Sequence, residues 1–192
     1  MTHSTTTETR KIGLISLGCA KNLIDAEIML GDAKLHGYEL TTETDDADVV
    51  LVNTCGFIDP AKEESISAIL EAHRRRLHGA KAGQKLVVGG CLSQRYSTDL
   101  ATQLPEVDAF LGLDEIKSAG SFFDRLLDEE RQEDGALVEV SRRSAYIPDY
   151  DTPRVRLTAS HTAYVKIAEG CNHPCSFCVI PRMRGRHRSR TI

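Results

Sequence analysis

The sequence of 192 residues predicts an α/β protein, with an open, mainly parallel sheet flanked by helices. The first observation is a set of three short apolar runs: IGLISL (12–17), VVLVN (49–53) and LVVGG (86–90). All three are rich in β-branched residues and lack polar alternation, which is typical of strands buried on both faces. The second is that helical patterns follow the runs. Alternating strands and helices indicate parallel strands joined by right-handed crossovers.

Two helices are predicted after the first two strands. The first begins at about Asn22 and ends near Gly37, because glycine commonly terminates helices. The second has Asp59 as its N-cap and Pro60 in its first turn, where both residue types are favoured. Its core-facing side is expected to comprise Ile66, Ile69, Leu70, His73 and Leu77.

The next part of the chain continues the alternation. Helices are expected at about 94–103 and 114–128, with a short strand, AFLG, at 109–112 between them. Residues 11–128 are therefore predicted to form one N-terminal domain, preceded by a disordered tail at 1–10.

A change of character begins at residue 129. Residues 129–161 contain charged clusters, prolines and tyrosines without clear periodicity, so we interpret them as a linker with a strand or two of its own. TAYVKIA at 162–168 predicts a new strand that leads into a cysteine loop. The second domain would therefore begin in residues 162–192.

Composition indicates the compartment. The chain is 41% hydrophobic and 27% charged, as in ordinary globular proteins. Its longest apolar runs fall far short of the roughly 20 residues that span a bilayer, and its polar start differs from a secretory signal. We therefore expect a cytoplasmic location, where thiols stay reduced. Six cysteines in such a chain favour metal binding or catalysis over disulfides.

Charge is distributed unevenly along the chain. The net charge is −4, yet residues 161–192 contain six Lys and Arg against one Glu. This basic end suggests a nearby phosphate, nucleic acid or acidic protein surface. The alternative is a solvated basic end without a partner.

Three cysteines share one structural position. Cys19, Cys55 and Cys91 each follow one of the predicted strands and are spaced 36 residues apart. A single cysteine after a strand is most often an inert buried residue. Three at equivalent positions indicate a shared role, because the carboxyl edge of a parallel sheet is its usual ligand site.

The other three cysteines form a C-x3-C-x2-C loop of Cys171, Cys175 and Cys178. A zinc site completed by His173 or His187 is one alternative, although this spacing is not a common zinc pairing. Soft thiolates alone favour an iron–sulfur cluster, and three of them leave one iron open to another ligand. We therefore expect a 4Fe–4S cluster at this loop, and a second one at the first three cysteines.

The flanking motifs resemble those of the radical S-adenosylmethionine (SAM) methylthiotransferases over about residues 11–190. SLGCAKN, VNTCGFID and GGCLSQRY resemble the N-terminal domain of that family, and the cysteine loop resembles radical SAM enzymes in general. SLGCAKNLIDAE and NTCGFIDPAKEES are most similar to the branch that methylthiolates an aspartate of a small-subunit ribosomal protein. The tRNA-modifying branch usually has glutamine or lysine after the first cysteine, and an arginine-containing stretch after NTC.

The resemblance implies a transferase with two clusters of different roles. The cluster at Cys171, Cys175 and Cys178 would bind SAM, whose reductive cleavage yields a radical that takes hydrogen from the aspartate β-carbon. The cluster at the first three cysteines would hold the added sulfur, and a second SAM would supply the methyl group. Such a C–H bond resists acid–base chemistry, so the hard step belongs to the cofactors.

The resemblance also implies partners. The substrate would be a ribosome-associated protein with RNA near it, and the chemistry needs an electron donor, such as flavodoxin or ferredoxin, that the sequence does not identify. We predict that Arg184 and Arg188, which follow the cysteine loop, bind substrate. A solvated arginine tail is the alternative.

In this family the radical SAM domain continues as a partial (β/α) barrel, followed by a small β-barrel domain. We therefore expect the chain to be an N-terminal fragment with a truncated barrel, inactive on its own. Two other functions stay open. One is a tRNA methylthiotransferase, and the other is a non-catalytic iron–sulfur or zinc module that binds nucleic acid.

Overall fold

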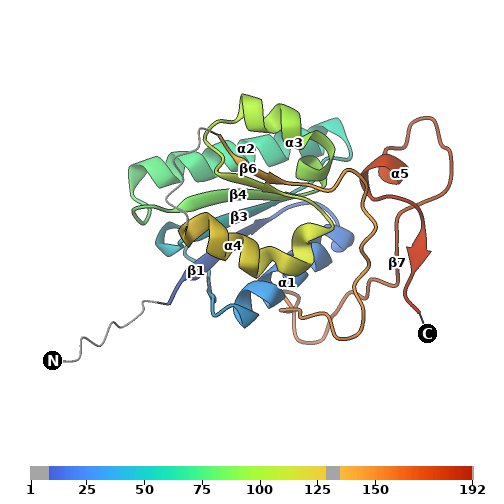
Figure 1. The fold of residues 1–192 in the computed structure, drawn as a ribbon, viewed down its shortest axis with the longest axis horizontal. Coiled ribbons are helices and arrows are strands. Elements are labelled where there is room, and N and C mark those ends of the chain that lie inside the picture. Colours follow the sequence, from blue (N-terminus) through green and yellow to red (C-terminus); the bar gives the residue numbers. More distant parts are fainter. Residues whose placement is uncertain (1–8, 129–134, 192) are drawn as a thin grey trace.

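The computed structural model describes residues 9–128 and 135–191, so most of the predicted tail lies outside the described residues. Its centre is a parallel six-stranded sheet in the order β2-β1-β3-β4-β5-β6 (Figure 1). The predicted open, parallel α/β fold is therefore confirmed. The strands are β1 (Lys11–Ser16), β2 (Glu39–Thr41), β3 (Val49–Thr54), β4 (Lys85–Gly90), β5 (Ala109–Leu111) and β6 (Leu137–Glu139).

Helices cover both faces of the sheet, which explains the apolar strands. All six residues of β3 are buried. On one face α1 (Ala20–Leu35) and α4 (Ala119–Asp128) pack together, and on the other lie α2 (Asp59–His78) and α3 (Cys91–Gln103) (Figure 1). Two separate apolar clusters result, one on each side of the sheet.

The predicted helices are confirmed, with corrections to three of the four. The N-cap of α2 is Ile58, and Asp59 is its first helical residue. The buried side of this helix is also different from the expected one, because Leu70 and Leu77 are exposed. The expected helix at 114–128 divides into a short 3-10 helix, η2 (Glu115–Ser118), and α4. The residues of α2 that are buried are Ser65, Ile69 and Ala72.

Helix α3 begins three residues earlier than expected, at Cys91 itself. The chain passes from β4 into α3 at Gly90, which adopts φ +91 and serves as the N-cap. A Cβ there would lie 2.5 Å from the carbonyl oxygen of Thr54, so only glycine fits. This turn places Cys91 directly at the end of β4.

The predicted linker contributes to the sheet. Its residues 137–139 form β6, which pairs in parallel with β5 at the sheet edge. Further on, the chain follows α1, where the N–H of Val155 donates to the carbonyl oxygen of Glu27. The segment between the two predicted domains is thus packed against the first of them.

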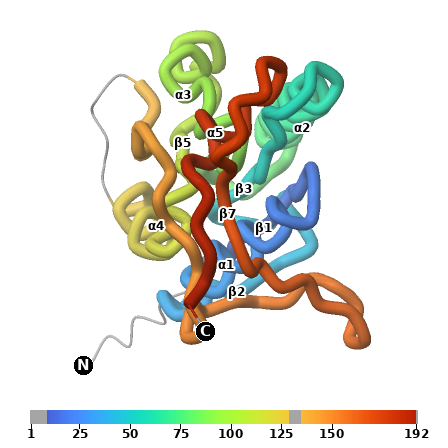
Figure 2. The backbone as a smooth tube through the Cα atoms, turned by 90° about the vertical axis from the view of Figure 1, so that its right-hand side faces the viewer, coloured from blue at the N-terminus to red at the C-terminus, as the bar shows by residue number. Residues whose placement is uncertain are grey.

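The expected strand at 162–168 is largely wrong. Of these described residues, Ala168 alone lies in a strand, β7 (Ala168–Glu169), which pairs in antiparallel fashion with β8 (Arg188–Ser189). A strand needs a neighbour for its hydrogen bonds, and β8 covers only this short stretch. The cysteine loop and the short helix α5 (Ile180–Met183) connect the two strands. This C-terminal segment crosses the end of the sheet (Figure 2). None of the described helices is both long and apolar enough to cross a membrane.

Candidate functional site

The first three cysteines lie at one edge of the sheet. Cys19 is the N-cap of α1, Cys55 follows β3, and Cys91 opens α3 after β4. Because β1, β3 and β4 are adjacent and parallel, their carboxyl ends lie together. All six cysteines of the described chain are free thiols. Within residues 9–128 and 135–191, no three or more His, Cys, Asp or Glu side chains are already grouped as a metal site.

Small residues let the backbones of this edge approach one another. A Cβ on Gly18 would lie 3.1 Å from the Cβ of Cys55. A Cβ on Gly56 would lie 2.9 Å from the carbonyl oxygen of Cys91. Larger residues at either position would therefore separate the turns that carry the cysteines.

Buried polar side chains hold these turns. The Asn22 side chain donates to the carbonyl oxygens of Leu17 (2.7 Å) and Thr54 (3.1 Å). The Ser65 hydroxyl accepts from the N–H of Cys55 (2.9 Å) and donates to its carbonyl oxygen (3.0 Å). The backbone on both sides of the cysteines is thereby fixed, which preorganises the edge.

The chemistry of the edge fits a sulfur-ligated cluster. Its donors are three reduced thiols, the soft ligands that iron–sulfur clusters take. The buried hydroxyl of Ser93, on α3 near Cys91, lacks a hydrogen-bond partner among the described residues. A buried hydroxyl without a partner is costly, so a bound group with acceptor atoms, such as sulfides, would suit this edge.

The second cysteine triad lies in an open loop. Cys175 is exposed, and Cys171 and Cys178 are partly exposed. The loop lines a cavity of about 890 Å³ together with Arg182, Arg186 and His187. Arg95, from α3, lines it as well, so the N-terminal sheet layer contributes to this second site.

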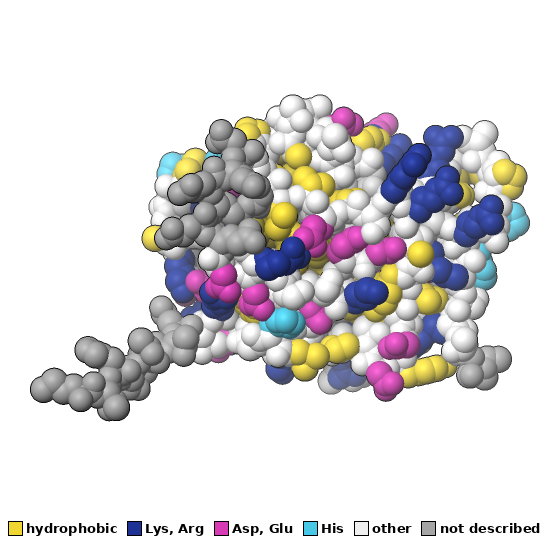
Figure 3. All heavy atoms as spheres, in the orientation of Figure 1, with side chains coloured by type: hydrophobic (Ala, Val, Ile, Leu, Met, Phe, Trp, Pro, Cys, Tyr) yellow, Lys and Arg dark blue, Asp and Glu magenta, His cyan; other side chains and the backbone are white. Residues whose placement is uncertain are grey.

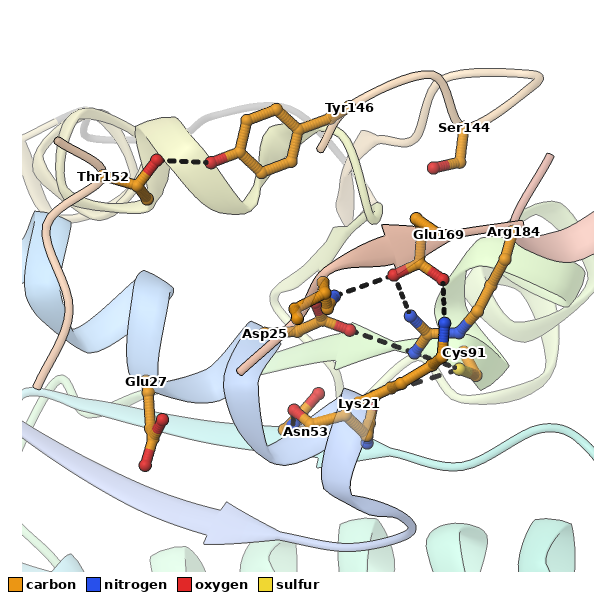
Figure 4. Close-up of polar contacts among 12 residues, drawn as sticks. Lys21, Asp25, Glu27, Asn53, Cys91, Ser144, Tyr146, Thr152, Glu169 and Arg184 are labelled. Atoms are coloured by element: carbon orange, nitrogen blue, oxygen red, sulfur yellow. Dashed lines mark hydrogen bonds and ion pairs between the residues drawn. The ribbon is translucent and has the colours of Figure 1, made fainter. Parts of the chain in front are cut away.

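A buried charge cluster links Cys91 of the first triad to Arg184 and Glu169, which flank the second triad in sequence (Figure 4). The guanidinium of Arg184 lies 2.9 Å from Glu169 Oε2, 3.0 Å from Asp25 Oδ2 and 3.0 Å from Cys91 Sγ. Lys166 Nζ lies 2.8 Å from Glu169 Oε2 and also contacts Asp25. We call Asp25, Lys166, Glu169 and Arg184 the buried quartet.

The pKa values of Glu169, a member of the quartet, and of the adjacent Cys91 are shifted. Burial opposes ionisation of Glu169, but Arg184, Lys166 and Lys21 outweigh it and lower the pKa of this carboxyl to about 2. Burial raises the pKa of the Cys91 thiol to about 11, although the Arg184 guanidinium opposes the shift. Glu169 is thus a fixed anion, whereas Cys91 without metal stays a neutral thiol.

Arg184 and Arg188, which the sequence predicts to bind substrate, both have partners within the chain. The side chain of Arg184 is only 3% exposed and is surrounded by the quartet. Arg188 is half-buried and donates to the backbone carbonyl oxygens of Tyr146 (3.0 Å) and Arg184 (2.9 Å). Both arginines therefore hold the fold together, because nearby carboxylates and carbonyls take up their donors.

Other arginines form an open basic groove. A cavity of about 850 Å³ is lined by residues from two segments that are distant in sequence, 142–145 and 181–188. Figure 3 shows Lys and Arg side chains gathered at the right-hand end of the molecule. Most arginines on the remaining surface pair with carboxylates, for example Arg74 with Glu71. Those of the groove have no carboxylate partner among the described residues. The basic groove comprises Arg142, Arg143, Arg182 and Arg186.

The sequence did not reveal the quartet. Asp25 shares the largely apolar stretch LIDAEIML with one other charged residue, Glu27, and Lys166 is the one charged residue of YVKIA. A charge on a buried face was the available signal, since such residues are almost always paired.

Comparison with known proteins gives the family. Residues 11–112 match the model of the uncharacterized protein family UPF0004. The chain is 56% identical over 185 residues to ribosomal protein uS12 methylthiotransferase RimO of Opitutus terrae, covering 95% of the chain and 39% of that protein. It is 54% identical to the RimO of Akkermansia muciniphila, covering 94% and 39%. It is 46% identical to that of Syntrophotalea carbinolica, covering 100% and 41%. The chain thus spans about two fifths of the length of these relatives. The resemblance seen in the cysteine motifs is confirmed, and the chain belongs to the UPF0004 family, with relatives named methylthiotransferases.

Proposed function

We propose that the chain is the cluster-bearing part of a methylthiotransferase that modifies the β-carbon of an aspartate in ribosomal protein uS12. One observation carries the proposal: two cysteine triads lie at the same end of the fold, and Arg184, from the segment of the second, touches Cys91 of the first. Relatives at 46–56% identity that carry the uS12 methylthiotransferase name support it.

The cysteine loop would be the radical SAM site. Cys171, Cys175 and Cys178 would hold a 4Fe–4S cluster, which together with SAM supplies the radical chemistry that an unactivated C–H bond requires. The chain's part is to present three thiolates on one short loop and to line the adjacent cavity. Arg95 would help position the bound molecule in that cavity, since its side chain is fixed by donation to the carbonyl oxygen of Gly56 (2.9 Å).

The sheet edge would be the sulfur-donating site. Cys19, Cys55 and Cys91 would hold the auxiliary 4Fe–4S cluster, and a second SAM would provide the methyl group. The protein's contribution here is rigidity. Asn22 and Ser65 fix the turns on which two of the ligands lie, and rigid supports suit a site that must deliver an atom at a defined place.

The basic groove would face the substrate. A ribosomal protein is surrounded by RNA, and arginines without carboxylate partners are suited to phosphates. A cytoplasmic location is consistent with such a substrate. We favour RNA contact over a purely acidic peptide because two separate segments supply the charges, as an extended polyanion would require.

Residues 1–192 alone are expected to be inactive. The cysteine loop is open to solvent, with Cys175 exposed and the Phe177 side chain 89% exposed. Radical chemistry needs a closed cavity that excludes water and side reactions. Additional structure at the length of the relatives would have to provide this closure.

Mass spectrometry of uS12 tests the proposal. A bacterial strain that lacks its own uS12 methylthiotransferase would receive a protein of the relatives' length that carries this sequence. We expect a methylthio group on one aspartate of uS12, and none when Cys175 is replaced by Ala. Methylthiolated tRNA nucleosides with unmodified uS12 would favour the tRNA-modifying alternative instead.

A further inference from the structure

We infer that Arg184 is a positioning residue that couples the two cysteine triads. It fastens the segment of the cysteine loop to the N-terminal sheet, and it holds the sulfur of Cys91 by a hydrogen bond. The first part stands on the geometry alone. The second part rests on the proposed function, because it concerns the group that Cys91 would bind.

Arg184 reaches three separate parts of the chain. Asp25 lies on α1, Glu169 on β7 and Cys91 at the start of α3, and one guanidinium donates to all three. A guanidinium offers five N–H groups in a fixed planar fork, whereas a lysine ammonium is a single point charge. Lysine could therefore keep the charge at this position but not the full set of contacts.

The quartet neutralises a buried carboxylate of the N-terminal layer, that of Asp25. Its two cations and two anions are each at most 4% exposed. Asp25 comes from α1, but both of its cationic partners, Lys166 and Arg184, come from the C-terminal segment. A buried charge without a partner is strongly destabilising. Docking of the segment and neutralisation of Asp25 are therefore the same event.

The environment of Cys91 depends on this docking. Its sulfur receives a donor from Arg184 at 3.0 Å, and its own S–H faces Asn22 Oδ1 at 3.8 Å. Hydrogen bonds to ligating sulfurs and nearby charge set the potential of iron–sulfur clusters. A guanidinium favours the more negative, reduced state. The segment that carries the second triad would thus raise the potential of a cluster at the first.

Hydrogen exchange measured by mass spectrometry tests the docking on the metal-free chain. In R184Q we expect faster exchange in peptides that cover 162–191, while those of β3 and β4 stay protected. R184K should retain most of the protection, because it keeps a cation between the two carboxylates. R186Q is the matched control, since Arg186 is exposed and lies in the same stretch. Unchanged exchange in R184Q would overturn the docking role.

The reduction potential tests the contact with Cys91. Cys171, Cys175 and Cys178 would be replaced by Ala, so that only the first triad can be loaded, and exchange would confirm that the segment stays docked. We expect a lower potential in both R184Q and R184K, and no change in R186Q. A potential that is unchanged in R184K, with docking retained, would overturn the coupling. Failure of the first triad to bind iron would contradict the proposed function, whereas the exchange result would still decide the docking.

Discussion

The two cysteine triads are built in opposite ways. Cys19, Cys55 and Cys91 stand at the ends of adjacent parallel strands, with their turns fixed by buried amide and hydroxyl groups. The loop of 171–178 has a two-stranded ribbon and a short helix for support, and most of its side chains are exposed. Rigid elements position groups more accurately than loops do. The first site is thus preorganised by the sheet, whereas the second depends on being fastened to it.

This contrast predicts very different costs for the loss of two phenylalanines. Phe110 lies in β5 with 0% exposure, and Phe177 lies in the cysteine loop with 89% exposure. Phe110→Ala should lower the free energy of unfolding by about 3–5 kcal/mol, because it leaves a cavity in the core. Phe177→Ala should change it by less than about 0.5 kcal/mol. Urea denaturation followed by circular dichroism gives both values, and similar losses would contradict the contrast.

The buried quartet should give the next largest effect. Asp25→Ala leaves Arg184 and Lys166 with too few anions, so we expect a loss of about 3 kcal/mol in the free energy of unfolding. Asp59→Ala is the matched control, because Asp59 pairs with Lys62 at the surface, where solvent screens the pair and its loss changes stability little. Equal losses in the two variants, measured by urea denaturation, would mean that the quartet does not hold the segment.

A smaller effect is expected at the turn of Cys55. Ser65→Ala removes the hydroxyl that bridges the N–H and carbonyl oxygen of Cys55. Because the N–H and carbonyl oxygen of Cys55 would lose this partner, the free energy of unfolding should fall by about 1–3 kcal/mol. Ser67→Ala, on the exposed side of the same helix, should change stability by less than about 0.5 kcal/mol. Thermal unfolding of the two variants measures both changes in stability. If Ser65→Ala destabilises the chain as little as Ser67→Ala does, water has replaced the Ser65 hydroxyl.

The basic groove should affect binding more than stability. Replacing Arg142 and Arg143 by Gln should reduce the slope of log affinity for RNA against log salt by about 1–2, since each lost phosphate contact contributes about 0.7–0.9. The matched control replaces Arg74 and Arg75 of α2, which pair with Glu71 and Asp45, and so changes net charge equally. Fluorescence anisotropy with a labelled RNA measures both slopes. Equal effects would indicate a general charge effect and not a groove.

Local patterns were sufficient for the buried half of the fold. The largely apolar runs of β1, β3 and β4 stand before glycine-containing turns, so the common edge of the three strands and the burial of β3 and β4 followed from the sequence. The expected burial of β1 on both faces is wrong, because only Ile12 and Gly13 of this strand are buried. The short edge strands β2 and β6 were not predicted individually, because three residues carry too little periodicity. The strand expected at 162–168 failed because pairing depends on a partner, and hydrophobic content alone does not reveal whether a partner exists.

In the candidate site, too, local features could be predicted from the sequence and long-range contacts could not. The six cysteines are recognisable from their spacing and flanking residues, since these features are local. The quartet is not, because Asp25 and Arg184 are 159 residues apart and meet only in the folded chain. The arginines after the cysteine loop show why contacts between distant residues could not be predicted. All five look alike in PRMRGRHRSR, yet the fold buries Arg184, ties Arg188 to carbonyl oxygens and leaves Arg182 and Arg186 exposed.

Iron and sulfide content per chain tests the central claim most directly. After anaerobic reconstitution, we predict two 4Fe–4S clusters in the wild-type chain. One cluster should remain when Cys19, Cys55 and Cys91 are replaced by Ala, and one when Cys171, Cys175 and Cys178 are replaced. Iron content that is unchanged after loss of the first triad, or zinc in place of iron and sulfide, would contradict the assignment of both triads as cluster ligands.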